Sequence, residues 1–444
     1  MNIAFINPPG NRFLYRGTIC TYISKSRYVW KPKDFILLSS MVPPDWKIHF
    51  LDSSINGKSA EYSLEWIKDK SPDIIVMAAS SISWEDDSNF LIKLRQEFPL
   101  KTIYTFGEVY FEPKAAEFAT KYVDAIIRDP LRFDFTTGKS THISGKKDTK
   151  QIRTQYPRHW LFNNWKYRWP FIRHFKFASV YTQFGCPFSC SYCTESLTNV
   201  TYRPAVDVLS EMRILKESGY KEILIGDATF GTPRDNAIEI LQGMIEERFN
   251  FSWSSYTHPS VMTEEMMDMS ARSGCHTFVI GIDSADTNML STYGRYVSRP
   301  VIENFIREAH RRGISVCGDF IIGFNGESEK SCKETIQMAL DIGVDYASFN
   351  IATPLLGSSL RQEGTELGFD TAGNNVMGTD TMSPATLVGL RNHAVRRFYL
   401  RPSYIWKRMT GIKTWQQLLL QANEGLGVGI NLLKARRKLT DGHL

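Results

Sequence analysis

Short apolar runs alternate with amphipathic segments over residues 1–130. A buried parallel strand reads as a nearly continuous apolar run, whereas a surface helix repeats its apolar positions every three or four residues. Strands separated by helices predict right-handed crossovers and a parallel sheet with helices on both faces, which is a doubly wound, Rossmann-like α/β domain. The expected strands are Asn2–Asn7, Lys47–Leu51, Asp73–Ala79, Lys101–Phe106 and Ala125–Ile127, with helices that include Ala60–Lys70 and Asp87–Glu97.

The same alternation restarts at Lys176, after a stretch that interrupts it. Six strand and helix units follow, which are too few to close an eightfold barrel. The pattern therefore predicts a partial (βα)6 barrel, whose open side can admit a large substrate. The expected strands are Phe177–Gln183, Glu222–Ile225, Phe251–Ser255, Thr277–Ile282, Ser315–Ile322 and Tyr346–Ile351. The expected helices are Val206–Glu217, Asn236–Arg248, Glu264–Ser273, Val301–Arg311 and Lys330–Ile342.

The 444 residues suggest two or three domains, because single hydrophobic cores rarely grow to that size. We expect the doubly wound domain at 1–135 and the barrel at 176–370. Between them, 136–175 is expected to be a linker or lid, since Gly, Thr, Ser and Lys dominate its first part and aromatic and basic residues its second. A basic helical segment, 371–444, completes the chain. Its expected helices are Ser383–Leu400 and Thr414–Gln421.

Composition and charge favour an ordinary globular protein. Hydrophobic residues make up 42% and charged residues 23%, and no apolar run approaches the roughly 20 residues that span a bilayer. The net charge of +6 is uneven, because residues 391–444 carry eleven Lys and Arg against Glu424 and Asp441, which leaves −3 for the rest. Nucleic-acid binding is therefore not expected. Seven cysteines and no signal peptide indicate a reducing, cytoplasmic location.

Three of these cysteines, Cys186, Cys190 and Cys193, lie in one short loop with the spacing Cys-x3-Cys-x2-Cys. Thiolates that close together can hold three corners of a cubane iron–sulfur cluster and leave the fourth iron open to a small molecule. A structural zinc ion needs a closed set of four ligands, and neither a second Cys pair nor a nearby His follows. The spacing favours a redox enzyme, with a non-enzymatic zinc-binding module as the alternative.

The segments around this loop resemble the radical SAM superfamily. The resemblance rests on the cysteines with Tyr192 between the last two, and on four ordered segments at later strand ends. It implies that Cys186, Cys190 and Cys193 hold a [4Fe-4S] cluster and that Tyr192 contacts the adenine of S-adenosyl-L-methionine (SAM). The four segments are Gly226-Asp227, Gly281 to Ser284, Phe320 to Ser328 and Thr353 to Ser358.

Roles for two of these segments follow from the same resemblance. Gly226 and Asp227 would contact the methionyl amine of SAM, and Asp283 and Ser284 would hold its ribose hydroxyls. The amine and carboxylate of SAM would chelate the open iron, and one electron from the cluster would release methionine and a 5′-deoxyadenosyl radical. That step requires no general base. His258, just beyond a barrel strand, is a candidate for lining the cavity.

The amino-terminal domain resembles the cobalamin-binding domain that precedes many radical SAM barrels. The resemblance rests on Ile6 to Pro9, Pro72-Asp73, Phe106-Gly107 and Val123-Asp124. The Asp-x-His-x-x-Gly loop that supplies a histidine ligand is absent, so cobalamin is expected to bind without a protein histidine as its lower ligand. Ligands of such sheets lie at the carboxyl ends of the strands. The candidate contacts there are Pro8, Pro9, Ser80, Ser81 and Gly107.

These resemblances lead to a cobalamin-dependent radical SAM enzyme, similar to class B methyltransferases, that methylates an unactivated carbon. The alternative keeps the architecture but uses the radical for cyclisation, oxidation or rearrangement. Methylthiotransferases are set aside, because they hold a second cluster on three amino-terminal cysteines and only Cys20 precedes Cys186. The expected partners are a small-molecule, lipid, tetrapyrrole or peptide substrate and a flavodoxin- or ferredoxin-type reductant, with membrane-surface contact through the basic carboxy-terminal segment as a further option.

Overall fold

The computed structural model describes residues 1–10, 14–19, 22–23, 29–140, 150–198, 200–368, 376–410 and 419. These residues divide into two compact units. The described residues of unit 1 fall within Met1–Lys146 and Thr154–Trp169. Those of unit 2 fall within Lys147–Arg153, Pro170–Thr371 and Asn375–Leu444, so the segment expected as a linker or lid is divided between the two.

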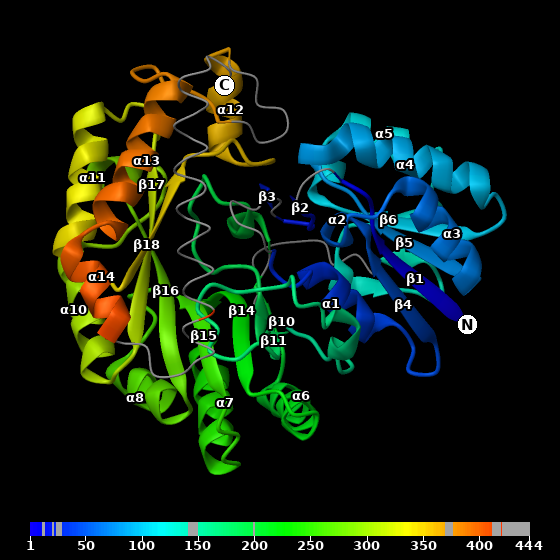
Figure 1. Cartoon of the computed structure of the whole chain (residues 1–444), viewed down its shortest axis with the longest axis horizontal. Helices are drawn as coiled ribbons and strands as arrows, with labels where there is room; N and C mark the ends of the chain where they lie inside the picture. Colours follow the sequence, from blue (N-terminus) through cyan, green and yellow to red (C-terminus); the bar gives the residue numbers. More distant parts are fainter. Residues whose placement is uncertain are drawn as a thin grey trace. The chain divides into compact units, whose positions relative to one another are not determined.

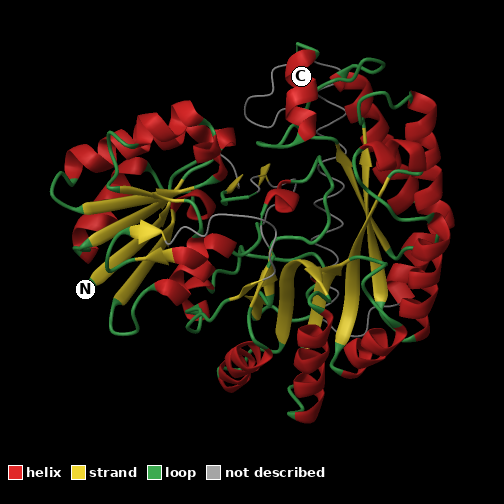
Figure 2. Ribbon diagram, turned by 180° about the vertical axis from the view of Figure 1, so that it is seen from behind, coloured by secondary structure: helices red, strands yellow, loops and turns green. Residues whose placement is uncertain are grey.

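Unit 1 is the expected doubly wound domain. Its five parallel strands lie in the order β4-β1-β5-β6-β7, and Figure 2 shows helices on both faces of the sheet. Every residue of β5 is buried, because both of its faces are covered. The order reverses between β1 and β5, which makes their carboxyl ends the topological switch point. The strands are β1 (Asn2–Asn7), β4 (Lys47–Asp52), β5 (Ile74–Ala78), β6 (Thr102–Phe106) and β7 (Ala125–Ile127).

The helices of unit 1 cover this sheet with a core of Ile, Leu, Phe and Ala side chains. α3 begins at an N-cap serine, Ser59, whose hydroxyl accepts from the Tyr62 amide, and it ends where Ser71 adopts a left-handed conformation. The helices are α1 (Lys33–Met41), α2 (Ser53–Asn56), α3 (Ala60–Lys70), α4 (Trp84–Glu97) and α5 (Pro113–Ala119). Two short strands, β2 (Leu14–Tyr15) and β3 (Tyr22–Ile23), pair with each other after β1.

Residues 154–169 pack onto unit 1. The Arg158 amide donates to the Ser39 hydroxyl at 2.9 Å, and its guanidinium donates to the Pro43 carbonyl at 2.7 Å. Tyr167 is fully buried, and its hydroxyl donates to the Asp52 carboxylate at 2.6 Å. These contacts anchor the aromatic half of the expected linker or lid to the doubly wound domain.

Unit 2 is the expected partial barrel. Its main sheet has six parallel strands in the order β11-β14-β15-β16-β17-β18, so neighbours in sequence are neighbours in space. Figure 1 shows the helices lying along one side of this curved sheet. The strands are β11 (Phe177–Val180), β14 (Glu222–Phe230), β15 (Ser252–Thr257), β16 (Cys275–Asp283), β17 (Ser315–Ile322) and β18 (Tyr346–Ile351). The helices include α6 (Ala205–Glu217), α7 (Arg234–Glu246), α8 (Glu264–Arg272), α10 (Arg299–Arg311) and α11 (Glu329–Asp341).

Two strand boundaries differ from the sequence-based expectation. β14 does not stop before Gly226-Asp227 but continues to Phe230, with an irregular register between Ile225 and Phe230. The expected strand Phe177–Gln183 ends at Val180, and Gln183–Phe184 instead forms β12, which pairs antiparallel with β13 (Thr201–Tyr202). The first difference lengthens the pairing of β14 with β15 as far as Phe230, and the second places Gln183–Phe184 in a small separate sheet with β13 and β10 (Lys150–Gln151).

The carboxy-terminal helices follow β18. α12 (Ser359–Glu366) is succeeded by α13 (Pro384–Tyr399), which agrees with the expected helix, and by α14 (Pro402–Thr410). α13 packs against β18 through Tyr399, whose hydroxyl donates to the Ala347 carbonyl at 2.8 Å. The expected helix Thr414–Gln421 lies outside the described residues except for Leu419. Among the described helices, none combines the length and apolar composition needed to cross a bilayer.

Asp345, just before β18, joins three elements of unit 2. Its carboxylate accepts from the Val316 amide at 2.9 Å and from the Lys407 ammonium at 2.8 Å, and it lies 2.7 Å from the His310 ring. Burial raises the pKa of Asp345, but these hydrogen bonds outweigh burial and lower it to about 2. The ionised carboxylate is therefore worth about 2 kcal/mol of folding free energy at neutral pH.

Substitution of Asp345 by asparagine is expected to lower the free energy of unfolding by about 2 kcal/mol at pH 7. A depressed carboxyl pKa stabilises the fold above the unfolded value of 3.8, and this stabilisation is lost as the pH falls through about 2. The difference from wild type should thus be roughly halved at pH 3. Urea denaturation at both pH values checks this, with the exposed Glu239→Gln as the control. A pH-independent difference would contradict the linkage.

Candidate cofactor site

The three cysteines lie in the loop between β12 and the 3-10 helix η5 (Thr194–Leu197), at the carboxyl end of the first barrel strands. Cys190 is buried, Cys186 and Cys193 are half-buried, and all three are free thiols. The loop turns tightly, since the Cys193 amide donates to the Cys190 carbonyl at 3.0 Å. The Cys186 sulfur lies 3.4 Å from the hydroxyl of Thr229 on β14. The sequence-predicted ligands are thus brought into one turn.

Burial and neighbouring sulfur atoms raise the pKa values of two thiols in the loop. Burial raises the pKa of Cys193 to about 12, and the neighbouring Cys186 and Cys190 sulfurs add to that rise. Burial also raises the pKa of Cys190. Across the described part of the chain, no three His, Cys, Asp or Glu side chains converge closely enough to hold a single metal ion. A cubane cluster does not require such convergence, because each thiolate binds a different iron at a different corner.

Asp227 ties the start of the cysteine loop to the barrel. It is fully buried, and its carboxylate accepts from the Thr182 amide at 2.7 Å, from the Thr182 hydroxyl, and from the Gln183 amide at 3.2 Å. Its neighbour Gly226 lies against the Tyr181 ring, where a Cβ atom would stand 2.4 Å from a ring carbon. The structure thus gives both residues a role in holding the loop, and their contact with the methionyl amine stays a prediction.

A second attachment holds the middle of the loop. The Ser191 amide donates to the Tyr293 carbonyl at 3.0 Å, and the Ser191 carbonyl accepts from the Ser359 amide at 2.9 Å. Gly294 has a φ of +70°, and a Cβ atom there would lie 3.0 Å from the Ser189 carbonyl oxygen. The backbone at Gly294 therefore rests directly on the loop, which only glycine allows without strain.

Tyr192 and Asp283, both predicted from sequence, are in direct contact. The Tyr192 hydroxyl donates to the Asp283 carboxylate at 2.9 Å. Asp283 ends β16 with a φ of +64°, an unusual conformation for a residue other than glycine. The same carboxylate pairs with the guanidinium of Arg295 at 2.9 Å, and each side chain is 7% exposed. Sequence reasoning missed Arg295, because it lies in the loop after α9 (Thr287–Thr292) and only the tertiary structure brings it to Asp283 at the end of β16.

The Ser284 side chain is not part of the Tyr192–Asp283–Arg295 group but belongs to a second buried hydrogen-bond network. Its hydroxyl lies 3.1 Å from the Thr335 hydroxyl and accepts from the Asp286 amide at 3.1 Å. Glu327 organises the neighbouring loop by accepting from the Gly323 amide at 2.7 Å and the Phe324 amide at 3.2 Å. The predicted ribose contact of Ser284 stays a prediction.

His258 lies against the cysteine loop. Its ring packs on that of Phe188 with centroids 4.1 Å apart and the planes tilted by 32°, and its Nδ1 atom accepts from the Ser260 amide at 3.2 Å. That hydrogen bond places the ring proton on Nε2. Burial, followed by the charge of Arg295, lowers the pKa of His258 to about 3, so the imidazole is neutral at physiological pH.

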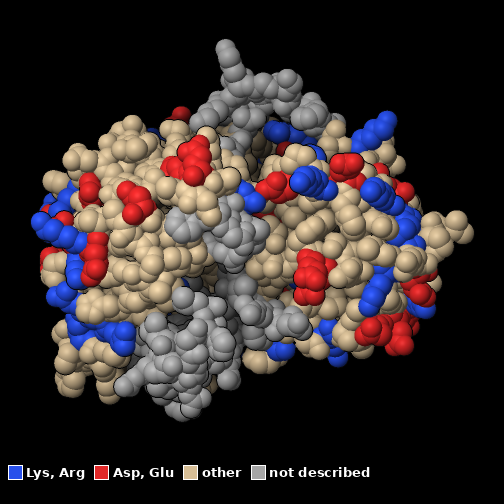
Figure 3. All heavy atoms as spheres, turned by 90° about the horizontal axis from the view of Figure 1, so that it is seen from above, with Lys and Arg blue, Asp and Glu red and all other residues tan. Residues whose placement is uncertain are grey.

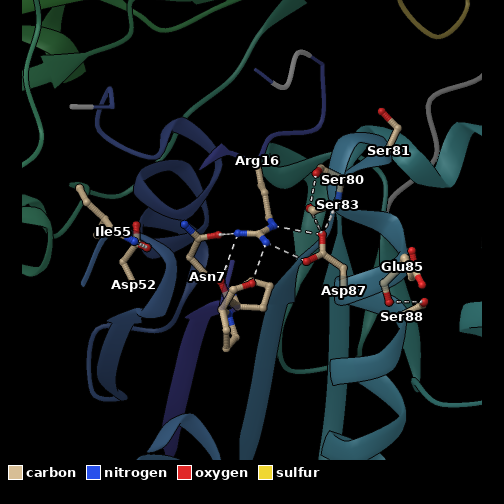
Figure 4. A network of polar contacts seen from close by, with 12 residues as sticks. Asn7, Arg16, Asp52, Ile55, Ser80, Ser81, Ser83, Glu85, Asp87 and Ser88 are labelled. Atoms are coloured by element: carbon tan, nitrogen blue, oxygen red, sulfur yellow. Dashed lines mark hydrogen bonds and ion pairs between the residues drawn. The ribbon is translucent and has the colours of Figure 1, made fainter. Parts of the chain in front are cut away.

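In unit 1, a buried ion pair fills the switch point between β1 and β5. Arg16 forms two hydrogen bonds to the Asp87 carboxylate, at 2.8 and 3.0 Å, and both side chains are completely buried. Its remaining N–H groups donate to Asn7 Oδ1 and to the carbonyls of Pro8 and Pro9. Figure 4 shows the guanidinium between these groups. All five guanidinium donors are therefore satisfied.

The other residues of unit 1 that were predicted to contact cobalamin lie at the same carboxyl edge of the sheet. The Ser80 amide donates to Asp87 at 2.9 Å, and the Ser81 amide and hydroxyl donate to Glu108. Gly107 comes so close to β5 that a Cβ atom would stand 1.9 Å from the Ala79 carbonyl oxygen. Pro8, Ser80 and Gly107 are buried, whereas Pro9 and Ser81 are partly exposed. A direct contact of these five residues with cobalamin stays a prediction.

A hollow lies at the carboxyl ends of β6 and β7. It is small and is lined by residues that include Thr18, Gly107, Tyr110, Ile126 and Arg128. Ligands of doubly wound sheets enter at this edge. Among the described residues of unit 1, the carboxyl edge of the sheet thus has a small hollow beside β6 and β7, while the Arg16 guanidinium occupies the switch point between β1 and β5.

The barrel and its cysteine loop define the class of this protein. Residues 180–339 match the family model described as the Radical SAM superfamily, so this part of the chain is a radical SAM domain and the protein is an enzyme. The chain is also similar, at 26% identity over 74% of its length and 77% of the relative's, to an uncharacterized methyltransferase of Pyrococcus horikoshii.

Two solved structures share the fold of both units. One is the cobalamin-dependent S-adenosylmethionine radical enzyme OxsB with aqua-cobalamin and S-adenosylmethionine bound, with a TM-score of 0.66, 14% identity, and coverage of 97% of this chain and 72% of that one. The other is the radical S-adenosylmethionine methyltransferase TsrM from Kitasatospora setae, with a TM-score of 0.59, 14% identity, and coverage of 84% and 77%. At this identity they establish the architecture.

Proposed function

We infer that this enzyme holds a [4Fe-4S] cluster on Cys186, Cys190 and Cys193, cleaves SAM, and uses cobalamin to methylate an unactivated carbon of its substrate. The observation that carries the inference is the cysteine loop, fixed at the carboxyl end of the barrel by Asp227 on one side and by residues 293–295 on the other. The likeness to a methyltransferase over three quarters of both chains supports the methyl transfer.

The donor set fits a cluster. Thiolates are the ligands of such clusters, and three of them in one loop leave the fourth iron for SAM. When bound, the cluster supplies the electron that releases a 5′-deoxyadenosyl radical, and the corrinoid supplies the methyl group. Cys193 and Cys190 have raised thiol pKa values, so metal binding must displace their protons.

The surrounding residues would orient SAM and exclude water. Tyr192 and Asp283 form a fixed, buried pair beside the loop, where adenine and ribose are expected. Neutral His258 keeps a ring face against Phe188 and its Nε2 proton available as a donor. Rigid groups of this kind hold a reactive species toward one hydrogen and reduce side reactions with solvent.

Unit 1 is proposed to carry the corrinoid. Its strand order is that of the flavodoxin-like doubly wound folds, whose ligands bind at the carboxyl edge. Among its described residues this edge presents the partly exposed Pro9 and Ser81, and binding without a protein histidine ligand stays a prediction. The side chains of Arg16, Asn7 and Asp87 occupy the space between the carboxyl ends of β1 and β5. The corrinoid would therefore lie on top of this edge and would not insert between the two strands.

The alternative outcome is a radical cyclisation, oxidation or rearrangement. The similarity to an anaerobic magnesium-protoporphyrin IX monomethyl ester cyclase of Rubrivivax gelatinosus, at 24% identity over 53% of this chain and 44% of the relative, supports it. Anaerobic reconstitution with iron, sulfide and a corrinoid, followed by reaction of candidate substrates, separates the two. Methyl transfer predicts consumption of methylcobalamin and a product heavier by one methylene. Failure of the protein to bind any corrinoid would refute the cobalamin part.

The proposed partners are a flavodoxin- or ferredoxin-type reductant and a small-molecule, lipid, tetrapyrrole or peptide substrate, in a cytoplasmic setting. α14 exposes Ile405, Trp406 and Met409 beside Lys407, a surface suited to an acidic protein or a membrane. Figure 3 shows basic and acidic side chains of the described residues interspersed on the visible face.

A further inference from the structure

We propose that the Thr229 hydroxyl donates a hydrogen bond to the Cys186 thiolate and thereby raises the reduction potential of the cluster. The inference rests on the proposed function, because it concerns a cluster that the cysteine loop would hold. Thr229 would act through Cys186 and is therefore a positioning residue. It lies beyond the Gly226-Asp227 segment on which the family resemblance rests, so it adds a residue and a physical effect to that resemblance.

Thr229 contacts the cysteine loop directly. Its Oγ1 atom lies 3.4 Å from the Cys186 sulfur, which is hydrogen-bonding distance for a sulfur atom. Thr229 is 4% exposed and Cys186 is half-buried, so water has limited access to the contact. β14 brings Thr229 to the loop because the strand continues past Asp227 to Phe230. The part of β14 that the sequence did not predict thus carries a hydroxyl to an expected cluster ligand.

Cluster binding decides which atom of this pair is the donor. A thiol can donate to the threonine oxygen or accept from it. A cysteine that ligates iron does so as a thiolate, which has no proton to donate and can only accept. In the described part of the chain, the Thr229 hydroxyl has no hydrogen-bond partner other than Cys186. In the loaded protein, the shared proton must therefore belong to Thr229.

A bridge of side chains connects the two partners by a second path. The Gln183 Nε2 atom donates to the carbonyl of Gly185, the residue before Cys186, at 3.4 Å. The Gln183 Oε1 atom accepts from the Thr232 hydroxyl at 2.6 Å, and the same hydroxyl lies 3.4 Å from the Thr229 carbonyl. Gln183 is completely buried. This second connection limits how far the Thr229 hydroxyl and the Cys186 sulfur can move apart.

A hydrogen bond to a ligand sulfur stabilises the reduced cluster more than the oxidised one. Reduction transfers one electron from the reductant to the cluster and increases the negative charge that the sulfur ligands carry. Hydrogen bonds to the sulfurs are among the factors that set the potentials of iron–sulfur clusters. Because Thr229 is buried, solvent screens the interaction weakly. Thr229 should therefore make the cluster easier to reduce.

The test is a potentiometric titration of the reconstituted enzyme without SAM, with a low-potential chemical reductant as the electron donor. Electron paramagnetic resonance measures the reduced cluster. Thr229→Val keeps the branched shape but removes the hydroxyl. At a fixed potential it should lower the ratio of reduced to oxidised cluster roughly fivefold, the net effect of one typical hydrogen bond. Thr229→Ser keeps the hydroxyl and should retain a midpoint close to that of wild type.

The matched control is Thr257→Val on the neighbouring strand β15. Thr257 is also 4% exposed, but its hydroxyl donates to the Phe230 carbonyl at 2.8 Å. This variant removes a buried hydroxyl from the same end of the barrel and should leave the midpoint unchanged. Omission of SAM separates the proposal from a role of Thr229 in binding SAM, which would leave the SAM-free potential as it is.

A shift in Thr229→Val that is absent in Thr229→Ser supports the hydrogen bond, because packing alone would not distinguish the two in this way. If Thr229→Val takes up no cluster, Thr229→Ala removes the same hydroxyl in a smaller side chain and replaces it in the comparison. Equal midpoints in wild type and the hydroxyl-free variant, or an equal shift in Thr257→Val, would overturn the proposal while leaving the cluster in place. Failure of the wild type to take up iron and sulfide would instead refute the proposed function.

Discussion

Replacement of Cys190 by alanine is expected to abolish the formation of 5′-deoxyadenosine from SAM. The proposed cluster takes three ligands from the protein, and the loop has three cysteines. Loss of the buried central one, Cys190, leaves only two. Cys186→Ala and Cys193→Ala should have the same effect. Iron and sulfide content after anaerobic reconstitution, together with product analysis, measures it.

The matched control is Cys275→Ala. Cys275 is a buried free thiol at the beginning of β16, whereas the proposed site lies at the carboxyl ends of the strands. This variant removes a sulfur from the same unit but should retain its iron, sulfide and SAM cleavage. Wild-type cluster content in Cys190→Ala would contradict the assignment of the ligands.

The second large effect is expected from Arg16→Met in unit 1. The substitution leaves the Asp87 carboxylate buried without its cation and removes the donors to Asn7, Pro8 and Pro9. Breaking a buried ion pair on one side typically costs about 3–5 kcal/mol. The thermal unfolding midpoint should fall on the order of 10 °C, as measured by circular dichroism or calorimetry.

Lys68→Met provides the comparison for this prediction. Lys68 pairs with Glu97 on the surface of the same unit, and exposed pairs contribute about 1 kcal/mol or less. The difference between the two variants isolates the effect of burial. If Arg16→Met were no less stable than Lys68→Met, the buried Arg16–Asp87 pair would not contribute the stability expected of it.

The main strands were predictable from sequence because their apolar residues form short runs, unbroken in β5 and alternating with partly exposed residues in β18. β1, β7, β17 and β18 have the bounds that the pattern predicts. α1 was not expected, since most of Asp34 to Ser40 is buried and the helix has almost no polar face to reveal a helical period. A helical period appears in a sequence only when one face of the helix is apolar and the other is polar. Since α1 is buried on nearly all sides, its sequence shows little of that contrast.

The candidate site was predictable only as far as its residues stand close in sequence. The cysteine spacing and Tyr192 are local and could be identified. Asp227 was assigned to SAM from the family resemblance, which stays a prediction, and the sequence could not reveal its hydrogen bonds to Thr182 and Gln183, which lie 45 and 44 residues away. Arg295 and Arg16 carried no signal, because isolated arginines are usually exposed and only tertiary structure reveals a buried carboxylate partner.

The most direct test of the account is an electron paramagnetic resonance spectrum of the reduced, anaerobically reconstituted protein before and after addition of SAM. An open iron predicts a [4Fe-4S] signal that changes when SAM binds, with three cysteines per cluster required for it. A protein that takes up zinc in place of iron and sulfide, or a cluster whose spectrum is indifferent to SAM, would contradict the central claim.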